Sequence, residues 1–146
     1  MDQLIRRCEP KSGSLASALR AIIDEGLVYE DGCVLLKSQF KLVQSNLRKH
    51  FQDETGYECF VNHVHLEDIL TSAGVCLLLE QALLLANELS ALKLNVGLFE
   101  PLEYIIVSDG NEMNVRFHVV RSGQSWLADD LGVYAEAVAA LRLPGA

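Results

Sequence analysis

The sequence predicts an α+β domain in which helices pack on a small antiparallel sheet, in the order α-α-β-α-(β)-β-β-α. Two observations predict this class. Apolar residues recur at helical spacing in the first half of the chain and again over residues 71–93. In the last third, two β-rich runs flank the dipeptide Asp109-Gly110, which is typical of an antiparallel hairpin.

Two helices are predicted in the first third of the chain. Residues 12–26 combine a Ser-Gly-Ser start with apolar residues at helical spacing, and the pattern ends at Gly26. After a turn at residues 30–32, residues 33–51 repeat the helical spacing, with lysines and arginines on the remaining positions. The second helix is therefore expected to be the basic part of the molecule.

The middle of the chain is predicted to hold a strand and a core helix. Residues 57–66 alternate and are rich in aromatic and β-branched side chains, which favours a strand. Over residues 71–93 the polar side chains fall on one narrow face and apolar side chains fill the others, which predicts a helix covered on several sides. Residues 94–99 are predicted to form a short strand.

The hairpin in the last third is predicted to run over residues 103–107 and 113–121. Because successive side chains of a strand point to opposite faces, Asn114, Arg116 and His118 are expected to share one face of the second strand.

A final helix is predicted after a turn at residues 122–125. Asp129 and Asp130 are expected to cap it, and it is expected to run through Leu141.

The composition predicts one folded domain over residues 1–146. Half of the residues are hydrophobic, so disorder driven by low hydrophobicity is excluded. The isoelectric point near 4.9 argues against direct binding of nucleic acid, because Lys and Arg are the residues that neutralise phosphates. A basic protein is the better expected partner.

The four cysteines, Cys8, Cys33, Cys59 and Cys76, contain no CxxC pair and no zinc-like spacing. The N-terminal segment has no apolar core of secretory length. Unpaired thiols without such a segment predict a reducing cytoplasm.

The apolar segment of residues 73–92 raises the question of a membrane span. Glu80 and Glu88 interrupt it, and a carboxylate near the centre of a span costs about 2.5–3.5 kcal/mol on insertion scales. We therefore expect no membrane crossing.

Negative charge is concentrated in the middle of the chain. Residues 51–112 hold eleven carboxylates and one basic side chain, whereas residues 1–50 sum to +2 and residues 113–146 to zero. Like charges gathered on one part of a compact chain repel one another. One reason to tolerate this loss of stability is a cationic partner that binds the negative charge. The alternative is that the acidic residues serve solubility alone.

His63, His65, Glu67 and Asp68 form the one candidate cluster for metal binding or acid–base chemistry, with His118 as a further ligand. Residues two apart on a strand point the same way, so His63 and His65 are able to share a ligand. The alternative is a structural one, because an exposed polar face of a strand that leads into a helix cap has the same residue pattern.

Arg116, His118 and Arg121, which precede Trp126, suggest a pocket for a phosphate or carboxylate. The alternative is a solvated sheet face whose arginines pair with neighbouring acids. Trp126 is the only tryptophan. It either locks a corner of the core or anchors a partner, since Trp is enriched among interface hot spots.

No enzyme and no cofactor is expected. Cys59 and Ser125 lack the glycine-flanked signature of a catalytic nucleophile, and neither GxGxxG nor GxxxxGK[ST] occurs.

Residues 104–110 and 115–127, followed by Asp130, Leu131 and Tyr134, resemble the small bacterial immunity proteins of contact-dependent inhibition and related polymorphic toxin systems. The resemblance covers about 45 residues and lies in style and size. It implies a cytosolic, non-catalytic protein that is often acidic. Many proteins of this kind block a nuclease domain by covering its basic active site.

Together these observations predict an immunity protein that neutralises a basic toxin domain, expected to be a nuclease. The residues expected to face the toxin are Glu58, Glu67, Asp68, Asp109, Glu112, Trp126, Asp129 and Asp130. One alternative is a type III secretion chaperone that binds an effector segment as a dimer through residues 73–92. A weaker one is a small metal-dependent enzyme that uses His63, His65 and His118. The sequence leaves open whether the protein is a monomer or a homodimer.

Overall fold

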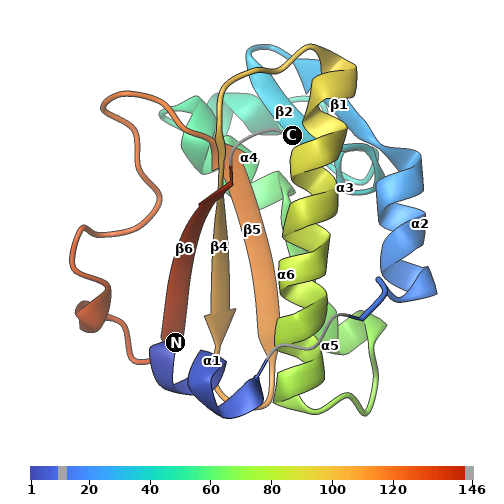
Figure 1. Ribbon diagram of the computed structural model, residues 1–146. Helices are drawn as coiled ribbons and strands as arrows, with labels where there is room; N and C mark the ends of the chain where they lie inside the picture. Colours follow the sequence, from blue (N-terminus) through green and yellow to red (C-terminus); the bar gives the residue numbers. More distant parts are fainter. Residues whose placement is uncertain (10–12, 144–146) are drawn as a thin grey trace.

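The computed structural model describes residues 1–9 and 13–143 and confirms the α+β class (Figure 1). A four-stranded antiparallel sheet has the strand order β3-β5-β4-β6, and a separate two-stranded hairpin pairs β1 with β2. The elements are α1 (Asp2–Cys8), α2 (Ser17–Glu25), β1 (Leu27–Glu30), β2 (Cys33–Leu36), α3 (Lys37–Phe40), η1 (Leu47–His50), α4 (Glu54–Val61), β3 (His63–His65), α5 (Leu66–Ile69), α6 (Val75–Leu92), η2 (Lys93–Val96), β4 (Leu102–Ser108), β5 (Met113–Val119), η3 (Leu131–Val133) and β6 (Ala137–Leu143).

The predicted core helix is confirmed as α6, which lies along one face of the sheet (Figure 1). Leu78, Leu85 and Leu89 are fully buried against inward side chains of β4 and β5 such as Tyr104 and Phe117. Burying a leucine side chain contributes about 1.5–3 kcal/mol, so this contact contributes strongly to the stability of the domain.

Residues 75–96 are long and apolar enough to cross a membrane by length and composition. The core helix of a folded domain passes the same test, and α6 packs its apolar residues into the main hydrophobic core.

The helix α2 packs beside α6 through polar contacts as well as apolar ones. Arg20 forms two hydrogen bonds of 3.0 Å with the carboxylate of Glu88. Gln81 donates to the carbonyl of Ser14 and accepts from the backbone amide of Ala16. The predicted stop at Gly26 is confirmed, because this residue adopts φ 87°, a conformation that glycine reaches without steric cost.

The predicted β4–β5 hairpin is confirmed, with the register Leu102↔Val119 to Ser108↔Met113. Asp109 holds the turn, because its Oδ1 accepts from the backbone amides of Asn111 and Glu112 at 2.8 Å. This is the local side-chain bonding that favours Asp in turns.

The predicted last helix, residues 129–141, is wrong. Asp130 accepts from the amide of Gly132 and caps the single turn η3, after which the chain becomes strand β6. Strand β6 pairs with β4 from Ser108↔Ala137 to Leu102↔Leu143. Pairing with an existing sheet edge outweighs the intrinsic helical preference of this alanine-rich segment.

The predicted helix over residues 33–51 is also wrong, because its first four residues form the buried strand β2. Asp31 and Gly32 both have positive φ and make the two-residue turn between β1 and β2. Short helical turns, α3 and η1, follow over the rest of the segment. A second hydrophobic cluster holds this hairpin against α4 through Cys33, Leu35 and Tyr57.

The predicted strand over residues 57–66 is wrong except at its end. Asp53 accepts from the amide of Gly56 at 2.7 Å and caps α4, so the alternating residues form a helix. Strand β3 covers His63–His65 alone. Residues 94–99, predicted as a strand, begin with the 3-10 turn η2.

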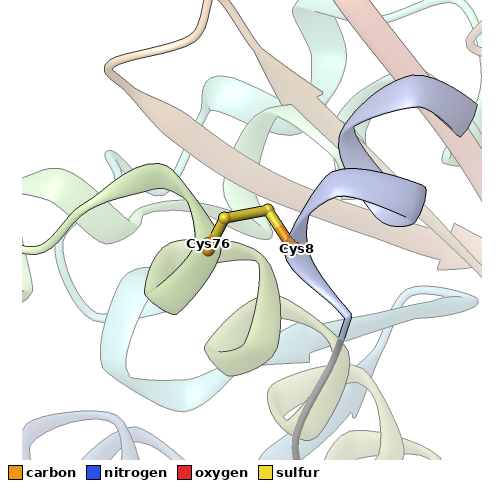
Figure 2. Close-up of a disulfide and its surroundings, with 2 residues drawn as sticks. All are labelled: Cys8 and Cys76. Carbon is orange, nitrogen blue, oxygen red and sulfur yellow. A yellow bond between two sulfur atoms is a disulfide. The ribbon is translucent and has the colours of Figure 1, made fainter.

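Two of the cysteines form a disulfide. Cys8 at the end of α1 is bonded to Cys76 in the first turn of α6, with the Cα atoms 5.0 Å apart (Figure 2). The expectation of four unpaired thiols is therefore wrong for this pair, while Cys33 and Cys59 are free and buried. The bond ties the N-terminal helix to the core helix across 68 residues of sequence.

Candidate functional site

The polar face of the sheet, opposite α6, carries the titratable side chains singled out in the sequence. We define this polar face by His63, His65, Asn114, Arg116, His118 and Glu103. The alternation of β5 directs Val115 and Phe117 into the main core and the side chains between them to the other side. The helix α4 packs on this polar face along β5.

Arg116 lies at the centre of the polar face. Its Nη1 donates to the carbonyl of Cys59 in α4 at 2.9 Å, and its guanidinium carbon lies 5.3 Å from the ring centre of Trp126. Burial lowers the pKa of Arg116 from its usual value. In the described part of the chain no carboxylate lies within salt-bridge distance of this guanidinium.

The segment between β5 and β6 carries Trp126 onto the polar face. Gln124 anchors the segment, because it accepts from the amide and hydroxyl of Thr55 and donates to the carboxylate of Glu54 at 2.9 Å. Trp126 then rests partly on Arg116 and remains 39% exposed. Trp126 is therefore neither a fully buried core residue nor a free surface residue.

A hollow of about 410 Å³ opens beside Arg116 and Trp126. Its wall is lined by Val107, Asn114, Arg116, Trp126, Leu127, Tyr134, Glu136 and Val138. The hydroxyl of Tyr134 accepts from the amide of Ala128 at 3.0 Å, which holds the ring against the segment that carries Trp126. The side-chain oxygen of Asn114 is buried and has no hydrogen-bond partner among the described residues.

His63 is paired in register with Arg116 and lies next to it on the polar face. Burial, followed by the positive charge of Arg116 and by His65, lowers the pKa of His63 to about 4. The imidazole is therefore neutral at pH 7. Its ring lies 4.1 Å, centre to centre, from that of His65.

The three histidines do not form a metal site together. His118 is buried and engages both ring nitrogens, Nδ1 with the carbonyl of Val119 and Nε2 with Glu103 at 3.1 Å. The side chains that are close enough to hold an ion are instead His65, Glu67 and Asp68, whose ligand atoms lie within 4.8 Å of one another. Glu67 already bonds His65 with one oxygen and the amide of Met113 with the other.

The prediction that Glu58 faces a partner is wrong. The carboxylate of Glu58 is fully buried and accepts from the amides of Val34 and Val119 at 2.8 Å. Arg121 donates to both of its oxygens. Glu58 and Arg121 therefore have a structural role, and the predicted anion pocket loses Arg121 and His118 but keeps Arg116.

Four of the predicted partner-binding carboxylates gather at one end of the sheet. We call this group the acidic end, defined by Glu67, Asp68, Asp109 and Glu112. Glu67 in α5 accepts from the amide of Met113 at 3.0 Å, which brings α5 beside the β4–β5 turn. Asp68, Asp109 and Glu112 are exposed, and no Lys or Arg in residues 1–9 and 13–143 forms a salt bridge with them. Backbone amides of Glu112 and Asn111 lower the pKa of Asp109, so it is ionised at pH 7.

Asp129 and Asp130 are exposed in the segment before η3. The neighbouring residues Leu131 and Gly132 share one hollow with Met1 and Gln3. Asp109 and Gly110 share another hollow with the same two N-terminal residues. The start of α1 therefore lies between the acidic end and η3, and the two groups of carboxylates flank it.

The sequence singled out Arg116 and Trp126 but missed two of their neighbours, Tyr134 and Glu136, as parts of one hollow. The alternation of β5 is the signal that placed Asn114 beside Arg116. No sequence signal places Glu136, because the segment that carries it was expected to be helical.

No curated protein and no solved structure shows significant similarity to the chain. A family model matches residues 1–143, which is nearly the whole length. The chain belongs to the Uncharacterized protein PM0498 family.

Proposed function

We propose that this chain is a cytoplasmic immunity protein that binds a basic toxin domain, such as a nuclease, and covers its active site. The observation that carries the proposal is the acidic end, where Asp68 and Glu112 come from separate segments yet lie on one exposed surface. A nuclease must present cations to the phosphates of its substrate. An anionic surface is complementary to such a site.

The acidic end also fits rapid capture of a toxin. Unpaired carboxylates on one surface steer an oppositely charged partner during diffusion, and the effect decreases as salt screens the charges. Trp126, 39% exposed, supplies an aromatic side chain of the kind that anchors interfaces. Glu58 is not part of this surface, so the proposed partner-binding residues are Glu67, Asp68, Asp109, Glu112, Trp126, Asp129 and Asp130.

The dimeric chaperone receives less support from the geometry. Among the described residues of α6, only Leu77, Asn87 and Ala91 are exposed, and α1, α2 and α5 contact the helix. This leaves a narrow surface for a second copy, whereas a stable interface buries about 800 Å² on each partner. We therefore propose one-to-one binding to the toxin.

The test has two steps. A partner is first identified by affinity capture from the source cell and mass spectrometry, and its toxicity is measured in cells with and without this protein. The affinity of the purified pair is then compared for the native chain, an Asp68→Lys/Glu112→Lys variant and a Glu100→Lys control. Glu100 is exposed and lies beyond the Leu102 end of β4, opposite the β4–β5 turn.

The proposal expects the double variant to lose affinity by tenfold or more, and the Glu100→Lys variant to bind as the native chain does. Protection from the toxin should fall in parallel. Equal affinity of all three chains, or affinity that does not change with ionic strength, would contradict the acidic end as the docking surface. A captured partner that is not toxic would contradict the immunity function itself.

The cytoplasmic location has its own test. Disulfides are rare in a reducing cytoplasm. Rapid alkylation of intact cells should therefore label Cys8 and Cys76 if the protein acts there, whereas an unlabelled, bonded pair would place it in an oxidising compartment.

A further inference from the structure

We propose that the hollow beside Arg116 and Trp126 is a binding site for a small organic carboxylate, with the guanidinium of Arg116 as its anchor. The site lies on the polar face of the sheet and shares no residue with the acidic end. It shares Trp126 with the residues proposed to bind the toxin, but its anchor, Arg116, is not one of them.

The first argument is the unpaired charge of Arg116. Partly buried arginines are normally paired with an acid, because removing a charge from water is costly. Arg121 follows this rule through Glu58, and Arg20 follows it through Glu88. Arg116 has one hydrogen bond in the described part of the chain, from Nη1 to the carbonyl of Cys59. Since a guanidinium has five N–H donors, the others are free for a ligand.

The second argument is that Arg116 is held in place before a ligand arrives. The carbonyl of Cys59 fixes one edge of the guanidinium, and the indole of Trp126 lies 5.3 Å from its carbon. A planar guanidinium with a free edge matches the two oxygens of a carboxylate. A group that is already oriented loses less entropy when the ligand binds.

The third argument concerns the rest of the wall. Val107, Leu127 and Val138 line the hollow with apolar atoms, which suits the carbon body of an organic acid better than inorganic phosphate. Asn114 lines it too, but its side-chain oxygen is buried beside His63, so the polar contact with the ligand rests on Arg116. The volume of about 410 Å³ lies within the range of roughly 300–1,000 Å³ typical of small-molecule sites.

Glu136 is the one acid on the wall and must be accounted for. It is exposed and does not form a salt bridge with Arg116 or with any other described residue. As a like charge it weakens the binding of a carboxylate, so its removal should favour the ligand.

The experiment uses the single tryptophan as the probe. Because Trp126 touches Arg116, its fluorescence should change when a carboxylate reaches the guanidinium. The native protein is titrated with butyrate, with the neutral isostere butyramide and with inorganic phosphate, at constant ionic strength. We expect a saturable change with butyrate, none with butyramide and weaker binding of phosphate. An equal response to butyramide would overturn the role of charge, and tighter binding of phosphate would overturn the assignment to carboxylates.

Variants then identify the anchor. Arg116→Gln should lower the affinity for butyrate about tenfold or more, which corresponds to the loss of one charge-assisted hydrogen bond. Arg116→Lys should bind with intermediate affinity, because the charge remains but the planar fork is lost. Glu136→Gln should bind at least as tightly as the native chain. Unchanged affinity in Arg116→Gln, or loss of binding in Glu136→Gln, would contradict the proposed site.

A measurement on the native chain guards against a variant that fails to fold. The side-chain Nε–Hε resonance of Arg116 should shift with the same saturation curve as the fluorescence of Trp126. A fluorescence change without any shift of that resonance would place the ligand elsewhere and overturn the proposal.

Discussion

Arg121 binds the fully buried carboxylate of Glu58 with two nitrogens, Nη1 to Oε2 at 2.8 Å and Nη2 to Oε1 at 2.7 Å. The same carboxylate accepts the backbone amides of Val34 in β2 and Val119 in β5. One side chain of α4 therefore links the β1–β2 hairpin to the main sheet. An acid that the sequence suggested for partner binding instead holds α4, β2 and β5 together.

Replacing Glu58 by alanine is expected to destabilise the protein by about 3–5 kcal/mol, because Arg121 and two backbone amides lose their partner. The free energy of unfolding is measured by chemical denaturation. As a control, Glu25→Ala removes the exposed pair with Lys41 and should change stability by about 1 kcal/mol or less. Similar losses in both variants would contradict a special role for Glu58.

Replacing Asn62 by alanine should cost about 2–4 kcal/mol, because the buried amide satisfies three backbone groups. Its oxygen accepts from the amide of Leu36 at 2.9 Å, and its nitrogen donates to the carbonyls of Val34 and Phe117. Denaturation of Asn62→Ala is compared with that of Asn95→Ala, an exposed asparagine in η2. If both variants unfold at the same denaturant concentration, the bridge of Asn62 is not needed for stability.

The Cys8–Cys76 disulfide is expected to stabilise the protein by up to about 4 kcal/mol, because it closes a long loop in the unfolded chain. Reduction should lower the melting temperature of the native chain. It should leave a Cys8→Ser/Cys76→Ser variant unchanged, since Cys33 and Cys59 are buried and free. A native melting temperature that does not respond to reductant would show that the bond does not stabilise the fold.

His63 is expected to make stability depend on pH in the acid range. Its pKa is about 4 in the folded chain and about 6.5 in the unfolded chain, so the unfolded state binds more protons between these values. The stabilisation is complete above pH 6.5 and is lost as the pH falls toward 4. The groups that act on His63 are Arg116 and His65, which lower its pKa, and Asn114 and Glu67, which raise it.

The measurement of this effect is the unfolding free energy of the native chain and of His63→Gln across that pH range. The native chain should lose about 1–2 kcal/mol more than the variant on acidification, after allowance for the partial exposure of the ring. Parallel pH profiles would show that His63 titrates normally. NMR titration of the His63 ring provides the pKa directly.

Two Asp-Gly dipeptides show how far the sequence alone leads. The pair at Asp109-Gly110 correctly predicts the β4–β5 hairpin, while the same pair at Asp31-Gly32 predicts only a turn before a helix. Both join antiparallel strands. The strands on either side of this turn are four residues long, and β2 is apolar and buried at every position, so no alternation distinguishes it from the helical spacing that follows.

The wrong predictions for α4 and β6 have the same physical origin. In both segments the local sequence pattern favours one structure and the tertiary contacts stabilise the other. The cap of α4 was present in the sequence as Asp53, but the aromatic and β-branched residues after it favoured a strand. Strand β6 has helical spacing and becomes a strand because β4 offers it an edge. The charge of Arg116 was visible in the sequence, but the lack of an acid beside it is a three-dimensional property.

The N-terminal helix has a practical consequence for any binding assay. Met1 shares a hollow with Asp109, so a purification tag attached to Met1 would lie next to the surface that the toxin is expected to cover. Leu143 pairs with Leu102 at the far end of β4. A tag that follows the last strand would leave the docking surface accessible. Experiments with immobilised protein should therefore attach the protein through a C-terminal tag.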